Sequence, residues 1–104
     1  MPCPGFRVEF NVNLTDPRLL LDYYRAIVEV LASSGCDSIS SHAWALAACE
    51  GSIVKVWIPK EVNIPLQARI RISVESGEPG MLIGIVKMLI KGMAERGITG
   101  ITMD

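Results

Sequence analysis

Two segments of the chain alternate apolar and polar residues with a period of two. Every second residue is apolar in residues 6–14, and the same pattern recurs in residues 68–75. Successive side chains of a strand point to opposite faces of a sheet, so this period predicts strands that each bury one face. The buried face of such a sheet must be covered by a second layer.

A helix is expected between the first strand and the middle of the chain. Asp16 followed by Pro17 is typical of a helix start, because a carboxylate caps the free N–H groups and proline suits the first helical position. Apolar residues then recur at intervals of three and four as far as Ser34. Gly35 is expected to end this helix.

A second helix is expected from about Pro79 to Arg96, with Gly97 at its end. Its apolar residues surround nearly the whole circumference, which indicates that it is buried on more than its sheet side. Gly80 and Gly84 would permit close approach of another backbone.

Residues 42–49 admit two interpretations. They are rich in alanine and could form a short helix on propensity. A hairpin with a two-residue turn at residues 50–51 accounts for more of the pattern, because one register creates an apolar face and places Trp44 opposite Trp57 on the other. We favour the hairpin.

With a closing strand at residues 98–103, the expected order is β-α-β-β-β-α-β. A helix that joins two strands favours a right-handed crossover, which places both helices on one face of the sheet. We therefore expect a single α+β domain over residues 1–104, a two-layer ferredoxin-like sandwich with an added strand. A chain of 104 residues is long enough for one hydrophobic core.

Three cysteines, Cys3, Cys36 and Cys49, form an odd set. In the expected sandwich, Cys3 and Cys36 precede strands that start at the same end of the sheet, which makes a bond between them conceivable. If residues 42–49 are a strand, the extended chain separates Cys36 from Cys49 too far for a disulfide; if they are helical, that objection lapses. With residues 42–49 as a strand and Cys3 bonded to Cys36, Cys49 would be the thiol that bonds the same residue of a second chain.

The cysteines also have alternative roles. They could be reduced thiols that pack as small hydrophobes. Together with His42 they have the ligand types of a zinc site, but no two cysteines have the usual close spacing. A Cys–His nucleophile pair needs an orienting group that no local motif identifies, and the glycine-bearing loop at residues 74–80 lacks the lysine of a P-loop. We expect no catalytic residue, cofactor or metal.

The uncovered face of the sheet would carry Trp44 and Trp57 beside Arg69 and Arg71. Aromatic and basic side chains on a sheet bind single-stranded RNA in RRM-type domains, although no RNP-like motif is present here. The net charge of -1 provides no general attraction to a polyanion. An apolar patch containing tryptophan also fits the contact surface of a homodimer, which we favour over RNA.

The compartment is predicted from the N-terminus and the apolar runs. The first residues lack the basic and apolar regions of a secretory signal. The longest apolar run, residues 81–90, is about half of the ~20 residues that a bilayer-crossing helix needs. We expect a cytoplasmic protein with no membrane partner.

The Met1-Pro2-Cys3-Pro4 start, the three scattered cysteines and the Ile/Val-rich strands resemble small uncharacterised proteins of hyperthermophilic archaea with structural disulfides. This resemblance carries no functional motif and implies no site. By fold analogy, the chain is also similar to stand-alone THUMP-type RNA-binding modules. Three hypotheses follow: a non-enzymatic, disulfide-stabilised homodimer; an RNA-binding domain; and a regulatory domain that binds a small molecule.

Overall fold

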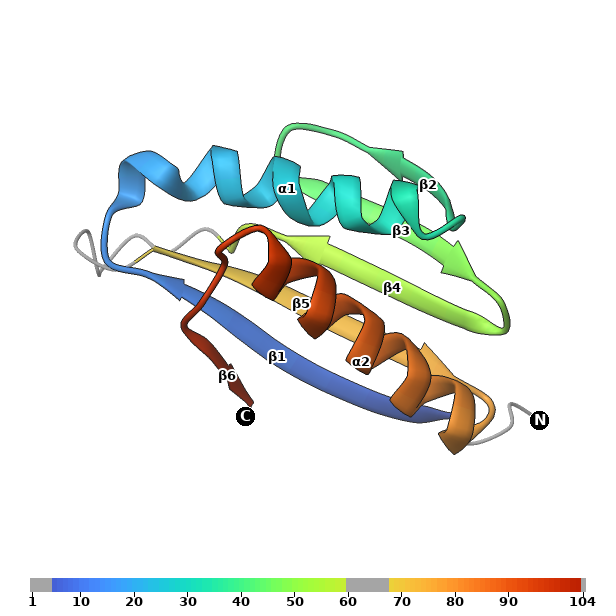
Figure 1. The fold of residues 1–104 in the computed structure, drawn as a ribbon. Coiled ribbons are helices and arrows are strands. Elements are labelled where there is room, and N and C mark those ends of the chain that lie inside the picture. The colour runs from blue at the N-terminus through green and yellow to red at the C-terminus, as the bar shows by residue number, and fades with distance from the viewer. Residues whose placement is uncertain (1–4, 60–67, 104) are drawn as a thin grey trace.

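The computed structural model describes residues 5–59 and 68–103. Over these residues the chain is an α+β protein with a six-stranded antiparallel sheet and two α-helices (Figure 1). The elements are β1 (Phe6–Leu14), the 3₁₀ helix η1 (Pro17–Leu19), α1 (Leu20–Ser33), β2 (Asp37–Ser40), β3 (Trp44–Cys49), β4 (Ser52–Trp57), β5 (Ala68–Ser76), α2 (Pro79–Glu95) and β6 (Ile101–Met103).

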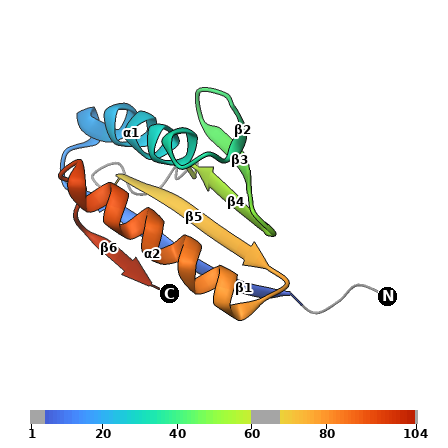
Figure 2. The same cartoon turned by 45° about the vertical axis from the view of Figure 1, so that its right-hand side comes forward.

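The strands lie in the order β2-β3-β4-β5-β1-β6, and every neighbouring pair is antiparallel. Both helices cross the same face of the sheet, with α1 on the side of the β2–β3 hairpin and α2 over β5 and β1 (Figures 1 and 2). The first and last strands are neighbours at one edge. The opposite face of the sheet carries neither helix, and we call it the open face.

Alternation along the strands creates the core, as expected. Inward-facing residues of the central strands are completely shielded from solvent, whereas several of their neighbours on the open face are exposed. The helices cover these residues with their own apolar stripes. The principal core side chains are Phe10, Val12, Tyr24, Ile27, Leu31, Val54, Val56, Ile70, Ile72, Val74, Leu89 and Met93.

The two helices touch each other at Gly92 and Val30. A Cβ atom added to Gly92 would lie 2.6 Å from Cγ1 of Val30, so the backbone of α2 is close to this side chain. Gly80 and Gly84, which were expected to provide such an approach, would place a Cβ with no atom of the described residues within 4 Å. The close helix contact therefore depends on Gly92.

The predicted helix ends are largely confirmed. Asp16 caps the first turn, where its side chain accepts a hydrogen bond of 3.0 Å from the Arg18 N–H. The Arg18 guanidinium also contacts this carboxylate and lowers the pKa of Asp16. The first turn is 3₁₀, so α1 itself begins at Leu20. Gly97, with φ of +77°, ends the second helix as expected.

The predicted hairpin is confirmed, including the pair of Trp44 with Trp57, and the helical alternative for residues 42–49 is wrong. One strand was not predicted. Residues Asp37–Ser40 form β2, which pairs with β3, so four strands rather than three lie between the helices. All four residues of β2 are exposed, and this strand therefore lacks the alternation that identified the others. The order of elements expected along the chain, β-α-β-β-β-α-β, therefore lacked β2.

Candidate functional site

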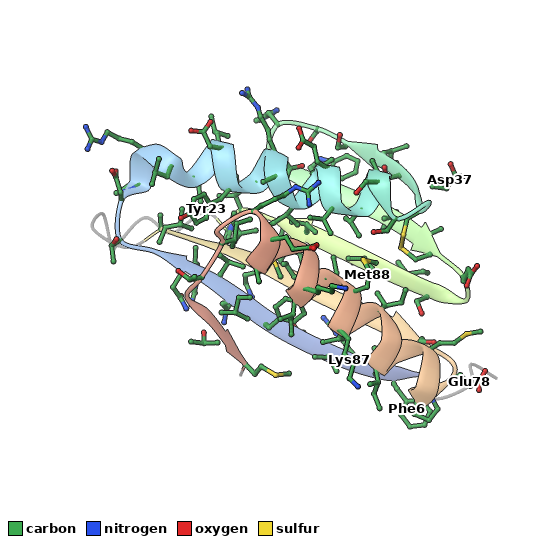
Figure 3. All side chains as sticks on the ribbon, in the orientation of Figure 1. Phe6, Tyr23, Asp37, Glu78, Lys87 and Met88 are labelled. Atoms are coloured by element: carbon green, nitrogen blue, oxygen red, sulfur yellow. A yellow bond between two sulfur atoms is a disulfide. The ribbon has the colours of Figure 1, made fainter. Side chains whose placement is uncertain are left out.

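A disulfide joins Cys36 to Cys49, with a Cα–Cα distance of 4.6 Å (Figure 3). The prediction that strand geometry separates these two residues is wrong. It treated the intervening chain as extended, whereas β2 and β3 fold back on each other with Asp37 opposite Ala48. The residues that flank this pair, Cys36 and Cys49, are therefore brought into bonding distance.

This bond also corrects the two other pairings that the cysteines suggested. Cys36 is bonded within the hairpin and does not pair with Cys3. Cys49 is buried and bonded in its own chain, in place of the expected bond to a second chain. Cys3 itself lies outside the described residues.

His42 lies far from this disulfide along the hairpin. The bond closes one end of the β2–β3 pair, and His42 follows Ser40 in the turn at the other end. In the part of the chain that the structure describes, no three His, Cys, Asp or Glu side chains form a group suited to a metal. The chain thus does not bring His42 together with Cys36 and Cys49.

The four residues singled out for the sheet surface do lie together on the open face. Trp44 of β3 stands opposite Trp57 of β4, and Trp57 stands opposite Arg71 of β5. The Arg71 guanidinium carbon is 5.9 Å from the centre of the Trp57 ring, within range of a cation–π contact. Arg69 lies two residues away on the same strand and face.

Carboxylates separate the basic side chains of this face. Glu9 contacts Arg7 at 3.2 Å through one oxygen and Arg71 at 3.4 Å through the other. Glu75 lies 4.0 Å from both Arg7 and Lys55. Basic groups on β1, β4 and β5 are therefore partly neutralised by residues of the same chain.

The other half of the open face, over β2, β3 and β4, is mainly apolar, and its charged residues are Asp37, opposite Ala48, and Lys55, opposite Leu46. Ile39, Trp44, Leu46 and Ile53 are exposed by 62, 47, 37 and 46%. A depression of about 340 Å³ lies among Ile39, Leu46, Ala48 and Ile53, and Asp37 and Ser38 of β2 line its edge. Ile39 was not a candidate from the sequence because β2 was not predicted. We call this surface the apolar patch; its residues are Ile39, Trp44, Leu46, Ala48, Ile53 and Trp57.

A second hollow, of about 390 Å³, lies on the helix side of the molecule between α1 and the β2–β3 turn. The Tyr24 hydroxyl donates a 2.9 Å hydrogen bond to the Ser41 carbonyl at this junction, and burial raises the pKa of Tyr24. We call this hollow the α1–turn pocket; it is lined by Leu21, Tyr24, Arg25, Val28 and Glu29 of α1 and by Ser40, Ser41 and His42 of the turn.

The α1–turn pocket has no signature in the sequence. Its residues come from a helix and from the end of a hairpin, and no local spacing relates them. Tyr24 and Val28 follow the apolar period of α1, whereas Arg25 and Glu29 are exposed and lie one turn apart. The fold brings these outward charges beside His42.

No protein-family model and no curated protein matches the chain. Neither helix within residues 5–59 and 68–103 combines the length and apolar character that crossing a bilayer requires. We therefore argue function from the geometry of the open face and of the α1–turn pocket.

Proposed function

We propose that the protein acts as a homodimer, with the apolar patch of one copy covered by the same patch of a second copy. The observation that carries this proposal is the contiguous exposure of Ile39, Trp44, Leu46 and Ile53 on three adjacent strands. Monomeric soluble proteins rarely leave such a cluster in water, and a contiguous apolar patch of this kind is typical of an interaction surface.

The shape of the patch favours a second copy as the partner. Trp44 stands exposed on β3, and the depression lined by Ile39, Ala48 and Ile53 lies beside it on the same face. A two-fold arrangement presents one surface to itself, so each projection can meet the other copy's depression. Trp44 can therefore fill the hollow of the partner while the partner's Trp44 fills its own.

The distribution of charge also supports this arrangement. The apolar patch forms one half of the open face, and the ion pairs of Glu9 and Glu75 form the other. A stable interface usually has an apolar centre and a polar rim. These carboxylates already have cationic partners in their own chain, and Lys55, opposite Leu46, lies 4.0 Å from Glu75. Asp37, which lines the depression, is the charge that the interface must leave at its rim in contact with water.

Sedimentation of wild type and of a Trp44→Glu variant tests the homodimer. We expect a wild-type dimer and a dissociation constant raised by about 30-fold or more in the variant, since a buried tryptophan anchor commonly contributes this much. Ile53→Lys, on the same patch, should also dissociate the dimer. Ile83→Glu is the matched control, because Ile83 is 55% exposed on the opposite, helix-bearing side.

Two results would overturn the homodimer. One is a wild-type protein that sediments as a monomer under both oxidising and reducing conditions. The other is a dimer that persists in both patch variants but dissociates with Ile83→Glu. Circular dichroism of each variant establishes that the fold is retained.

A second candidate function is single-stranded RNA binding, favoured by the contact of Arg71 with the Trp57 ring. A base can stack on such a platform, and nearby cations attract the phosphates. Glu9 and Glu75 oppose this attraction, so we rank RNA below the homodimer. Binding of labelled single-stranded RNA that weakens steeply with salt, and is lost in the Arg69→Ala/Arg71→Ala variant, would favour RNA.

We also propose a cytoplasmic protein from a hyperthermophile. The Cys36–Cys49 bond supports this source, because intracellular proteins of hyperthermophiles retain disulfides that a mesophilic cytosol would reduce. A thermal midpoint above ~90 °C is expected for such a protein. A midpoint in the range of ~45–65 °C, typical of mesophilic domains, would contradict it.

A further inference from the structure

The α1–turn pocket has the size and the lining of a small-molecule site. Its volume of about 390 Å³ lies in the range of natural ligand pockets. Leu21, Val28 and the ring of Tyr24 provide apolar walls. Hydroxyl groups and the imidazole of His42 line the side formed by the turn. A few polar groups around an apolar wall is the usual composition of a ligand pocket.

Two opposite charges flank this pocket from the same helix. Arg25 and Glu29 are one turn apart on α1, both are exposed, and both line the hollow. Within the described residues neither side chain makes an ion pair or a side-chain hydrogen bond, in contrast to the paired charges of the open face. The pocket therefore presents one cationic and one anionic group that a ligand can engage.

A small molecule that satisfies both groups must itself carry a negative and a positive charge close together. An α-amino acid has this arrangement, with a carboxylate and an ammonium on one carbon. The carboxylate suits the planar guanidinium of Arg25, and the ammonium suits the carboxylate of Glu29. An aliphatic side chain then lies against Leu21 and Val28. We propose that the α1–turn pocket binds a free aliphatic α-amino acid.

Two contacts, one at each end of the β2–β3 hairpin, fix the wall of the pocket that this hairpin forms. Tyr24 is hydrogen-bonded to Ser41 at the pocket, and the Cys36–Cys49 disulfide closes the far end of β2 and β3. The wall that carries His42 is thus fixed relative to α1 before a ligand arrives. Preformed walls reduce the entropy that binding must overcome.

Calorimetric titration with L-leucine tests the proposal, with two analogues that each lack one charge. We expect saturable binding of leucine, and binding weaker by about tenfold or more for 4-methylpentanoate, which lacks the ammonium, and for 3-methylbutylamine, which lacks the carboxylate. Arg25→Gln should weaken leucine and leave the amine unchanged. Glu29→Gln should weaken leucine and leave the acid unchanged.

Lys91 and Glu95 provide the matched control, because they are another exposed cation and anion one turn apart, on α2, and they line a separate hollow that shares no residue with the α1–turn pocket. The Lys91→Gln/Glu95→Gln variant should bind leucine as wild type does. The proposal is overturned if leucine produces no saturable heat at ~10 mM, well above the millimolar dissociation constants of weak small ligands. It is also overturned if both analogues bind as well as leucine, or if the control pair weakens binding as much as Arg25→Gln.

Discussion

The Tyr24 hydroxyl donates a hydrogen bond of 2.9 Å to the backbone carbonyl of Ser41. This bond connects the middle of α1 to the turn between β2 and β3, which are an edge strand and its only neighbour in the described sheet. The edge of the sheet is thereby attached to the helical layer.

Replacing Tyr24 with phenylalanine should lower the free energy of unfolding by about 1 kcal/mol, because the Ser41 carbonyl loses its donor in a partly buried position. Urea unfolding measures this difference. Tyr23→Phe is the matched control, since no hydrogen bond from the Tyr23 hydroxyl occurs among the described residues. An equal loss in both variants would show that the Tyr24 bond has no special contribution.

Stability should also fall at alkaline pH through Tyr24. Burial raises the pKa of this phenol, so above a pH of about 10 the unfolded chain releases the proton while the folded chain retains it. The contribution of Tyr24 to the free energy of unfolding is fully present below the pKa that this phenol has in the unfolded chain. It is lost as the pH rises through the higher pKa of the folded chain. The wild type should therefore lose more stability than Tyr24→Phe between about pH 9 and about pH 11. Parallel pH profiles would contradict this assignment.

Removing the disulfide with Cys36→Ser/Cys49→Ser should destabilise the protein by about 3 kcal/mol, the chain-entropy value for a loop of this length. Denaturant unfolding of the variant and wild type measures the loss, and Cys3→Ser serves as the control. Peptide mapping without reductant should recover Cys36 linked to Cys49. Recovery of a peptide that links Cys3 to Cys36 would refute the observed pairing.

Gly92→Ala should destabilise the protein by about 1–3 kcal/mol, because the new methyl group meets Val30 at the helix contact. Gly84→Ala is expected to have the opposite sign, a gain of about 0.4–1 kcal/mol, since its Cβ enters open space on the same helix. Thermal unfolding compares the two. If both variants lose stability, the predicted opposite signs are wrong, and the open space at Gly84 does not allow an alanine to stabilise α2.

The sequence predicted the elements that have a strong period. Alternation located β1, β5 and the β3–β4 hairpin, including the pairing of Trp44 with Trp57, because each of these strands has one buried face. Glycines and a capping aspartate located the helix ends. These patterns are local consequences of burial and backbone geometry, so one sequence is sufficient to recognise them.

Elements without a buried face could not be found in this way. β2 is short and fully exposed, and its pairing with β3 is determined by the hairpin rather than by its own composition. Missing β2 led directly to the wrong cysteine pairing. The α1–turn pocket was missed for a related reason, because Arg25 and His42 become neighbours only when the edge of the sheet docks against α1.

Both tryptophans of the chain lie side by side on the open face, and Trp44 is 47% exposed. Indole emission depends on the polarity of the surroundings, so the intrinsic fluorescence of this protein reports on the hydration of one face of one sheet. Whatever covers that face, whether a second copy or a nucleic acid, displaces water from the same two rings. The molecule thus carries an unlabelled optical probe on its open face.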